Sequence, residues 1–328
     1  MNNDRYTGPF KDHIGRHVAL KQAVGYKYQT DAAHLARFDR FTLENYPEAT
    51  ALTREMVLDW CSKKEHETQA NQCTRASIIR QFGLYLDGIG VAAYVIPKRY
   101  YPTEMPYVPH IYSTDELQRF FVETDRCRYC VECPDRHLIM PLFFRMIYTC
   151  GLRVSEARLL TVGDVDMEQG ILSVHHSKKD NSRLVPMSDE LTERCRGYFR
   201  QVHPFPKDAD MFFPALGGKP MTLTNVYHNF RRFLWRAGIS HGGSGKGPRI
   251  HDLRHTYACH CLKQWVLQGK DLAAYLPVLK TYLGHDSFAE TAYYLRLTAD
   301  VFPDLTLKLE GRYPDMIPTL ERAADETD

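Results

Sequence analysis

Arginine, histidine and tyrosine residues in the second half of the chain have the side-chain chemistry needed to cleave a phosphodiester. They occur in His251-Asp-Leu-Arg254-His255-Thr, in Leu283-Gly284-His285 and at Tyr294, with Arg153 upstream. A guanidinium can grip two phosphate oxygens, an imidazole can move a proton near neutral pH, and a tyrosine hydroxyl can attack phosphorus. These residue types indicate a phosphodiester substrate, and the chemistry requires no nucleotide cofactor.

The histidines of the first segment also have to be considered as metal ligands. His251, Arg254 and His255 are spaced i, i+3 and i+4, so a helix places all three on one face. An isolated His-x3-His is a zinc-ligand spacing, but the metalloprotease motif requires Glu where this chain has Asp252. Because Arg254 would also bring a positive charge beside the metal, we expect no metal there.

A cysteine-rich stretch offers a second metal hypothesis. Its pattern is C-x2-C-x2-C-x3-H, formed by Cys127, Cys130, Cys133 and His137. These ligand types suit tetrahedral zinc, but the spacing is tighter than the usual pairs of ligands. We therefore expect reduced thiols in a polar connection rather than a zinc site.

Five segments, taken in chain order, resemble the motifs of tyrosine recombinases of the phage integrase family. They are Thr149-Cys-Gly151-Leu-Arg153-Val-Ser-Glu156, Ser177-Lys178-Lys-Asp-Asn-Ser-Arg183-Leu-Val-Pro186, His251-Asp-Leu-Arg254-His255-Thr, Leu283-Gly284-His285, and Tyr294. The resemblance implies a mainly α fold with a small β-hairpin or sheet (α+β). It also implies a helical N-terminal core-binding domain and a tyrosine-recombinase catalytic domain.

The resemblance implies a catalytic set without a cofactor: Arg153, Lys178, His251, Arg254, His285 and Tyr294. The family's interval of nine residues from the Leu-Gly-His histidine selects Tyr294 as the nucleophile over Tyr293. Lys178 is found by counting back from Arg183, and Lys179 is its nearest alternative. Arg183 and Thr256 receive no catalytic role.

The mechanism implied is cleavage of one DNA strand through a 3′-phosphotyrosine. Arg153 and Arg254 would hold the non-bridging oxygens, His251 would accept the tyrosine proton, and His285 would bond the phosphate. Lys178 would protonate the departing 5′-oxygen. These proton transfers need catalytic groups, because a tyrosine hydroxyl has a pKa of about 10 and does not lose its proton readily at neutral pH. Exchange through a Holliday junction would require four protomers on double-stranded DNA recombination sites, and accessory proteins remain open.

Changes in composition along the chain predict its domains. Residues 1–95 read as a helical domain, with helices near Thr30 and Thr53 and one that stops at Gly88. The family resemblance implies that this domain clamps DNA. Prolines and loss of helical period mark a linker over 96–111. The catalytic domain, 112–328, begins with a Ser113-Thr-Asp-Glu116 capping box.

Within the catalytic domain, the sequence predicts the elements that carry the candidate residues. Gly151 should turn the chain left-handed and present Arg153 at the start of a short helix. Two strands surround the hairpin lysine, at Gly170–His175 and Arg183–Pro186. Thr224 is expected to cap a helix through Trp235, and Ser287-Phe-Ala-Glu290 to cap the helix of Tyr294.

Overall composition limits the classes of function. The 328 residues carry a net charge of +2 and a pI of 8.0, so any DNA contact must come from local basic faces. Nine cysteines, a polar start and no apolar run of roughly 18 residues indicate a reducing cytoplasm and no membrane contact.

Several alternatives stay open at this stage. A type IB topoisomerase would use the same nucleophile to relax DNA, and an idle DNA-binding regulator would keep only the fold. The Tyr293-Tyr294-Leu295 segment is similar to the corresponding segment of recombinases from mobile elements, which implies a role in integration, excision or transposition. The segment with Phe302, Leu305, Leu307 and Leu309 is expected to dock on a neighbouring protomer, with docking in cis as the alternative.

Overall fold

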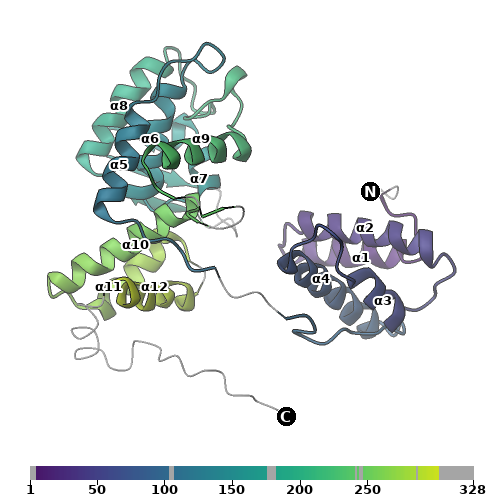
Figure 1. Cartoon of the computed structure of the whole chain (residues 1–328). Helices are drawn as coiled ribbons and strands as arrows, with labels where there is room; N and C mark the ends of the chain where they lie inside the picture. The colour runs from purple at the N-terminus through teal and green to yellow at the C-terminus, as the bar shows by residue number, and fades with distance from the viewer. Residues whose placement is uncertain are drawn as a thin grey trace. The chain divides into compact units, whose positions relative to one another are not determined.

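The computed structural model describes residues 5–102, 107–175, 182–240, 242–243, 247–285 and 287–302. The chain divides into two compact units, Met1–Tyr107 and Val108–Asp328, and each is treated by itself. Helices dominate both units, with one small sheet in the second (Figure 1). The expected mainly helical α+β fold is confirmed.

The first unit is a bundle of the helices α1 (Lys11–Ala23), α2 (Gln29–Asn45), α3 (Arg54–Cys61) and α4 (Gln69–Gly88). The Thr53 hydroxyl caps α3 by accepting the backbone N–H of Met56 at 3.2 Å, as the sequence predicts. Aromatic rings fill the interior, and Phe38 and Phe82 are buried with ring centroids 6.3 Å apart. The apolar periodicity of this region is therefore explained by packing inside the bundle.

The second unit begins with α5 (Thr114–Asp125) and α6 (Arg136–Thr149), followed by the short α7 (Val154–Arg158). The predicted capping box is confirmed, since the Ser113 hydroxyl accepts the Glu116 N–H and the Glu116 carboxylate accepts the Ser113 N–H. Gly151 is left-handed at φ +57°, and a Cβ there would lie 2.7 Å from Leu283. The turn that leads to α7 therefore needs glycine.

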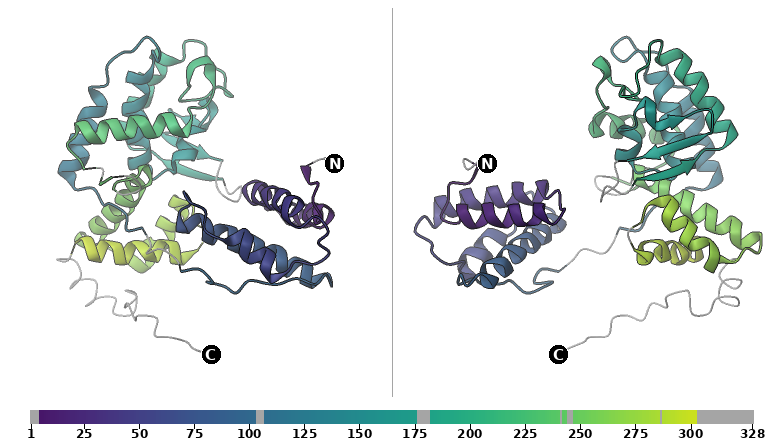
Figure 2. Two further views of the ribbon diagram at one scale, coloured as in Figure 1. Left: turned by 45° about the vertical axis from the view of Figure 1, so that its right-hand side comes forward. Right: turned by 180° about the vertical axis from the view of Figure 1, so that it is seen from behind.

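The sheet has the strand order β1-β2-β3 and is antiparallel throughout. Its strands are β1 (Val165–Asp166), β2 (Ile171–Val174) and β3 (Arg183–Pro186), seen as arrows in the right view of Figure 2. Leu172 and Val185 are paired and fully buried, so one face of the hairpin belongs to the core. The strands predicted around the lysine segment are confirmed.

Helices complete the second unit: α8 (Asp189–Val202), α9 (Leu223–Arg236), α10 (Ile250–Leu267), α11 (Leu272–Leu283) and α12 (Phe288–Val301), with 3-10 turns η2 (Val162–Asp164) and η3 (Leu216–Gly218). The prediction for α9 is wrong by two residues, because Thr222 rather than Thr224 caps it, accepting the N–H of Asn225. Both threonines have the right chemistry, but Leu223 already begins the helix.

The last three helices form a small core of their own, which includes Leu262, Leu283 and Leu295. They are the green to yellow helices of Figure 1. Tyr294 belongs to this core, so the candidate nucleophile is positioned by packing of α12 on α10 and α11. In the described part of the chain, no helix is both long and apolar enough to span a membrane.

Candidate active site

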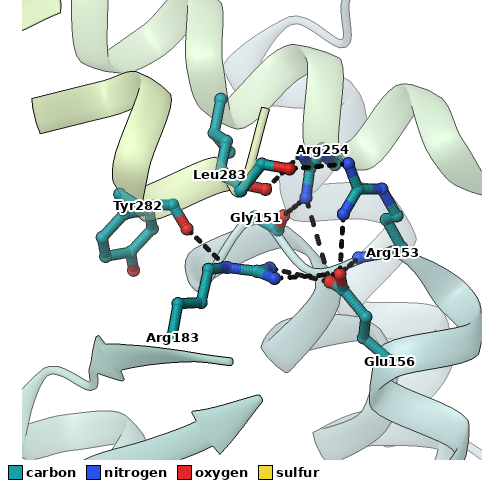
Figure 3. Close-up of polar contacts among 8 residues, drawn as sticks. Gly151, Arg153, Glu156, Arg183, Arg254, Tyr282 and Leu283 are labelled. Atoms are coloured by element: carbon teal, nitrogen blue, oxygen red, sulfur yellow. Dashed lines mark hydrogen bonds and ion pairs between the residues drawn. The ribbon is translucent and has the colours of Figure 1, made fainter. Parts of the chain in front are cut away.

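Three arginines converge on the buried carboxylate of Glu156 (Figure 3). Arg153 Nη1 donates to Glu156 Oε1 at 2.8 Å, and the Arg153 backbone N–H donates to Oε2 at 2.8 Å. Arg183 donates to both oxygens, at 2.9 and 2.8 Å. Arg254 Nη1 lies farther away, 3.9 Å from Oε2. Glu156 thus lies among three cations, which come from the residue before α7, from β3 and from α10.

The same arginines are held by backbone carbonyls at the end of α11. Arg183 Nε donates to Tyr282 O at 2.8 Å, Arg254 Nη2 to Leu283 O at 2.6 Å, and Arg153 Nη2 to Gly284 O at 2.9 Å. Three consecutive carbonyls therefore each hold a different arginine. Arg254 Nη1 is bound in addition by Gly151 O at 2.7 Å. The end of α11 therefore holds all three guanidiniums, in addition to the carboxylate of Glu156.

Burial and charge together set the ionisation of this cluster. Burial alone would raise the pKa of Glu156, but hydrogen bonds and charge from Arg183, Arg153 and Arg254 lower it to about 2. Burial and the charge of Arg153 lower the pKa of Arg254 to about 10. Glu156 and Arg254 are therefore both charged at neutral pH. With three guanidiniums around one carboxylate, the cluster has net positive charge that can attract an anion. Arg254 is 1% exposed, and its Nε has no hydrogen-bond partner among the described residues.

Tyr294 lies beside this cluster with its hydroxyl engaged. The side chain is 2% exposed, and the hydroxyl is hydrogen-bonded to His255 Nδ1 at 2.9 Å. Its ring stacks on His285, with centroids 5.6 Å apart and planes 13° apart. Burial raises the pKa of Tyr294 to about 12, although the charge of Arg254 opposes this rise. Tyr293 is only partly buried and packs against the same core.

The three histidines of the site are neutral at pH 7. Burial, His251 and Arg254 lower the pKa of His255 to about 3, and burial and the two arginines lower that of His285 to about 3. Desolvation by neighbouring groups and the charges of Arg254 and Arg153 lower the pKa of His251 to about 4, although the residue as a whole is exposed at the start of α10. Neutral imidazoles can accept protons, so this site is suited to taking a proton from a hydroxyl.

The structure gathers most of the predicted residues in one place: Arg153, His251, Arg254, His285 and Tyr294. His251 packs edge-on against His255, with ring centroids 4.6 Å apart. Lys178 and its alternative Lys179 lie outside the described residues. Leu305, Leu307 and Leu309, which are expected to dock on a neighbouring protomer, also lie outside the described residues.

Three residues without an assigned role proved to belong to the site. Glu156 and His255 belong to the recognised motifs of Arg153 and Arg254. Their closeness to these arginines in the sequence could have indicated that they belong to the site. Arg183 stands in the matched hairpin segment, but nothing in its spacing shows that it reaches α11. Long-range packing alone brings it there.

The cysteine-rich stretch is not gathered around a common point. Among the described residues, no group of three or more histidine, cysteine or acidic side chains is placed to hold a metal ion. Cys130 donates to Glu132 at 2.6 Å, and His137 Nδ1 is hydrogen-bonded to Pro134 O at 2.8 Å. In this conformation the thiols and the histidine serve local contacts.

Comparison with known proteins identifies the family. Residues 113–300 match the family model described as "Phage integrase family", which is more than half of the chain. The chain is 31% identical over 296 residues to the putative integrase/recombinase y4rE of Sinorhizobium fredii, covering 88% of this chain and 92% of the relative. It is 27% identical over 312 residues to y4rB of the same organism, covering 93% and 98%.

Solved structures share the fold. The XerH site-specific recombinase, in a post-cleavage complex with a palindromic difH substrate, matches with a TM-score of 0.61 at 18% identity. The match covers 86% of this chain and 78% of that chain. The chain belongs to the phage integrase family of tyrosine recombinases. Its activity is that of a site-specific DNA recombinase.

Proposed function

We propose that this chain cleaves and rejoins DNA strands through a covalent 3′-phosphotyrosine at Tyr294. The observation that carries the proposal is the buried Tyr294 hydroxyl, 2.9 Å from a neutral imidazole and next to fixed guanidiniums. In the cleavage step the phenolic oxygen bonds to phosphorus and the bond from phosphorus to the 5′-oxygen breaks. The reverse attack by a 5′-hydroxyl restores the phosphodiester, so the strand can be rejoined without an external energy source.

In this proposal Arg153 and Arg254 stabilise the charge that develops on the non-bridging oxygens. Both guanidiniums are held before the substrate arrives, which is the preorganisation that makes such groups effective. Removing either is expected to cost about 2.7 to 4 kcal/mol of transition-state stabilisation. The unpaired Nε of Arg254 gives this residue a donor that the described part of the protein has not already used.

The proton from Tyr294 goes to His251 in our scheme, and His285 supplies a hydrogen bond to the phosphate. Lys178 protonates the departing 5′-oxygen. The short contact between Tyr294 and His255 adds a further part, because it gives His255 the task of orienting the attacking hydroxyl. Two histidines would then act in sequence on one hydroxyl, one to orient it and one to receive its proton.

The finer biological role that we propose is integration, excision or transposition of a mobile element, with strands exchanged through a Holliday junction in a tetramer. The names of the relatives, putative integrase/recombinase, support the role. The XerH complex, a recombinase bound to its DNA substrate, supports double-stranded DNA as the partner.

We propose the domain division 1–95, 96–111 and 112–328, with the first part clamping DNA. A basic pocket of about 350 Å³, formed by α4 of this first part together with the beginning of the linker, supports this role. Arg80, Lys98 and Arg99 line it together with Tyr100 and Tyr101, and no carboxylate is among its lining residues. In the described chain these three cations have no ion-pair partner, which suits them to phosphate groups.

The test is a duplex nicked close to the cleavage position in the element's own end sequence, so that the cleaved strand cannot be rejoined. Wild type, Tyr294→Phe and the matched control Tyr293→Phe are incubated with it, and covalent products are separated on denaturing gels. We expect an adduct from wild type and Tyr293→Phe and none from Tyr294→Phe. An adduct that persists in Tyr294→Phe would move the nucleophile to another residue. No adduct from any protein that binds the duplex would favour an idle regulator.

A further inference from the structure

Each of the three guanidinium nitrogens of Arg183 donates a hydrogen bond within the protein, although the residue has no role in the proposed chemistry. Arg183 is the first residue of β3, and its side chain is 6% exposed. Two of its nitrogens are paired with the two oxygens of Glu156, and Nε donates to Tyr282 O. The residue therefore ties the hairpin strand to α7 and to the end of α11 (Figure 3). These are the elements that hold the phosphate-binding arginines.

The pairing determines which cation Glu156 binds. The carboxylate side chain is fully buried, so it depends on protein donors for its charge. Arg183 supplies one donor to each oxygen, and Arg153 supplies the others. Arg254 is 3.9 Å from Oε2, beyond hydrogen-bond distance. Arg183 thus occupies the positions through which Glu156 could bind Arg254.

We infer that Arg183 is a positioning residue for DNA cleavage. It saturates Glu156 and holds the Tyr282 carbonyl, and in this way it keeps Arg153 and Arg254 directed at the scissile phosphate. The inference rests on the proposed function, in which those two arginines bind the phosphate.

Loss of Arg183 has a definite consequence in this geometry. A buried carboxylate that loses one of its partners draws in the nearest cation that is not already bonded to it. Arg153 is bonded already, so that cation is Arg254. Arg254 would then neutralise Glu156 instead of the phosphate. A purely structural role predicts something different, namely a loss of activity that follows the loss of folded protein.

The experiment compares Arg183→Lys, Arg183→Met and the double variant Arg183→Met with Glu156→Gln. Lysine keeps the charge but lacks the planar fork of arginine, which pairs with both carboxylate oxygens and also donates from Nε to Tyr282 O. Arg158→Met is the matched control. Arg158 is the last residue of α7, the helix that contains Glu156, but its guanidinium donates to Met221 O. Folded fraction, DNA affinity and the single-turnover rate of adduct formation on the nicked duplex are measured for each variant.

We expect both Arg183 single variants to bind DNA within about threefold of wild type, because phosphate contacts elsewhere dominate affinity. Their adduct rate per folded molecule should fall about 100-fold, as for a displaced oxyanion donor. The double variant should recover about tenfold over Arg183→Met, because its neutral amide no longer competes for Arg254. Arg158→Met should keep the wild-type rate.

Rates per folded molecule that stay at the wild-type level in both Arg183 variants would overturn the inference, and so would a double variant no faster than Arg183→Met. A crystal structure of Arg183→Met gives a readout that does not depend on cleavage. We expect Arg254 within about 3 Å of Glu156 there, and an unchanged separation would also overturn the inference. An absent adduct in wild type would instead count against the proposed function.

Discussion

Tyr294 is surrounded by neutral imidazoles, and this environment determines how its proton can leave. His255 contacts the hydroxyl directly, while His251 packs on the ring of His255. Their folded pKa values, about 3 and about 4, lie below the ordinary value for histidine, so both are unprotonated at pH 7. Either could accept a proton, and only substitution separates the orienting from the accepting role.

Replacing His251 with Gln should lower the adduct rate by about 10² to 10⁴, the usual contribution of a general base. His255→Gln should lower it less, by about tenfold, because the amide can still hydrogen-bond the hydroxyl. Single-turnover assays on the nicked duplex measure both. A larger loss in His255→Gln than in His251→Gln would transfer the accepting role to His255.

At the scale of single residues, sequence reasoning found the side chains that stand in local motifs. Arg153, Arg254 and Tyr294 are recognised by their neighbours in the chain, and the structure brings them together. The bonds of Arg183 to Glu156 and Tyr282 span 27 and 99 residues, respectively. No local pattern contains such a pairing, because it depends on how β3 packs beside α11.

The end of α11 is the element on which the arginine cluster depends. Gly284 closes the helix in the left-handed region at φ +65°, and a Cβ there would lie 2.9 Å from Arg183 Nη1. Glycine is therefore required twice, once for the backbone and once for the guanidinium beside it. The Leu-Gly-His motif consequently has a steric reason as well as a chemical one.

Gly284→Ala should destabilise the protein and slow cleavage. Gly217→Ala is the matched control, because Gly217 has φ +77° and a Cβ there would meet nothing within 4 Å. We expect the control to lose about 1–2 kcal/mol for the left-handed conformation alone. Gly284→Ala should lose a further 1–3 kcal/mol, roughly, from the disturbed buried hydrogen bonds. Urea unfolding measures the difference, and equal losses would contradict this explanation.

Helix starts were predicted where a single polar residue could cap the helix. Ser113 and Ser287 both accept the N–H of the residue three positions on, as expected. The start of α9 was misplaced because Thr222 and Thr224 both have capping chemistry, and only packing of the helix decides between them. Caps are local, so they are predictable to within such choices.

At the scale of the whole molecule, a net charge of +2 conceals local concentrations of positive charge. The pocket with Arg80, Lys98 and Arg99 in the first unit is one of them. Arg99 also adopts a left-handed conformation at φ +56°, which is uncommon for a residue with a side chain. Overall charge therefore could not identify the proposed DNA-clamping surface.

Changing Arg80, Lys98 and Arg99 to Gln together should weaken DNA binding and make it less sensitive to salt. The slope of log affinity against log salt should become shallower by about 0.9 for each phosphate that the variant no longer neutralises. Lys11→Gln, an exposed position on α1 outside the pocket, serves as control. Binding titrations over a range of salt concentrations measure the slopes. An unchanged slope in the triple variant would remove this pocket from the DNA interface.

The covered position of Tyr294 has a consequence for the cell that makes the protein. The side chain is 2% exposed, so in the proposed mechanism the hydroxyl can reach a phosphorus atom only after the packing around the ring opens, while its hydrogen bond to His255 is kept. Protein molecules that are not bound to their DNA target would then leave phosphodiester bonds uncleaved. The number of DNA strand breaks would depend on the number of occupied target sites rather than on the number of protein copies. A cell could therefore contain many unbound copies without additional strand breaks.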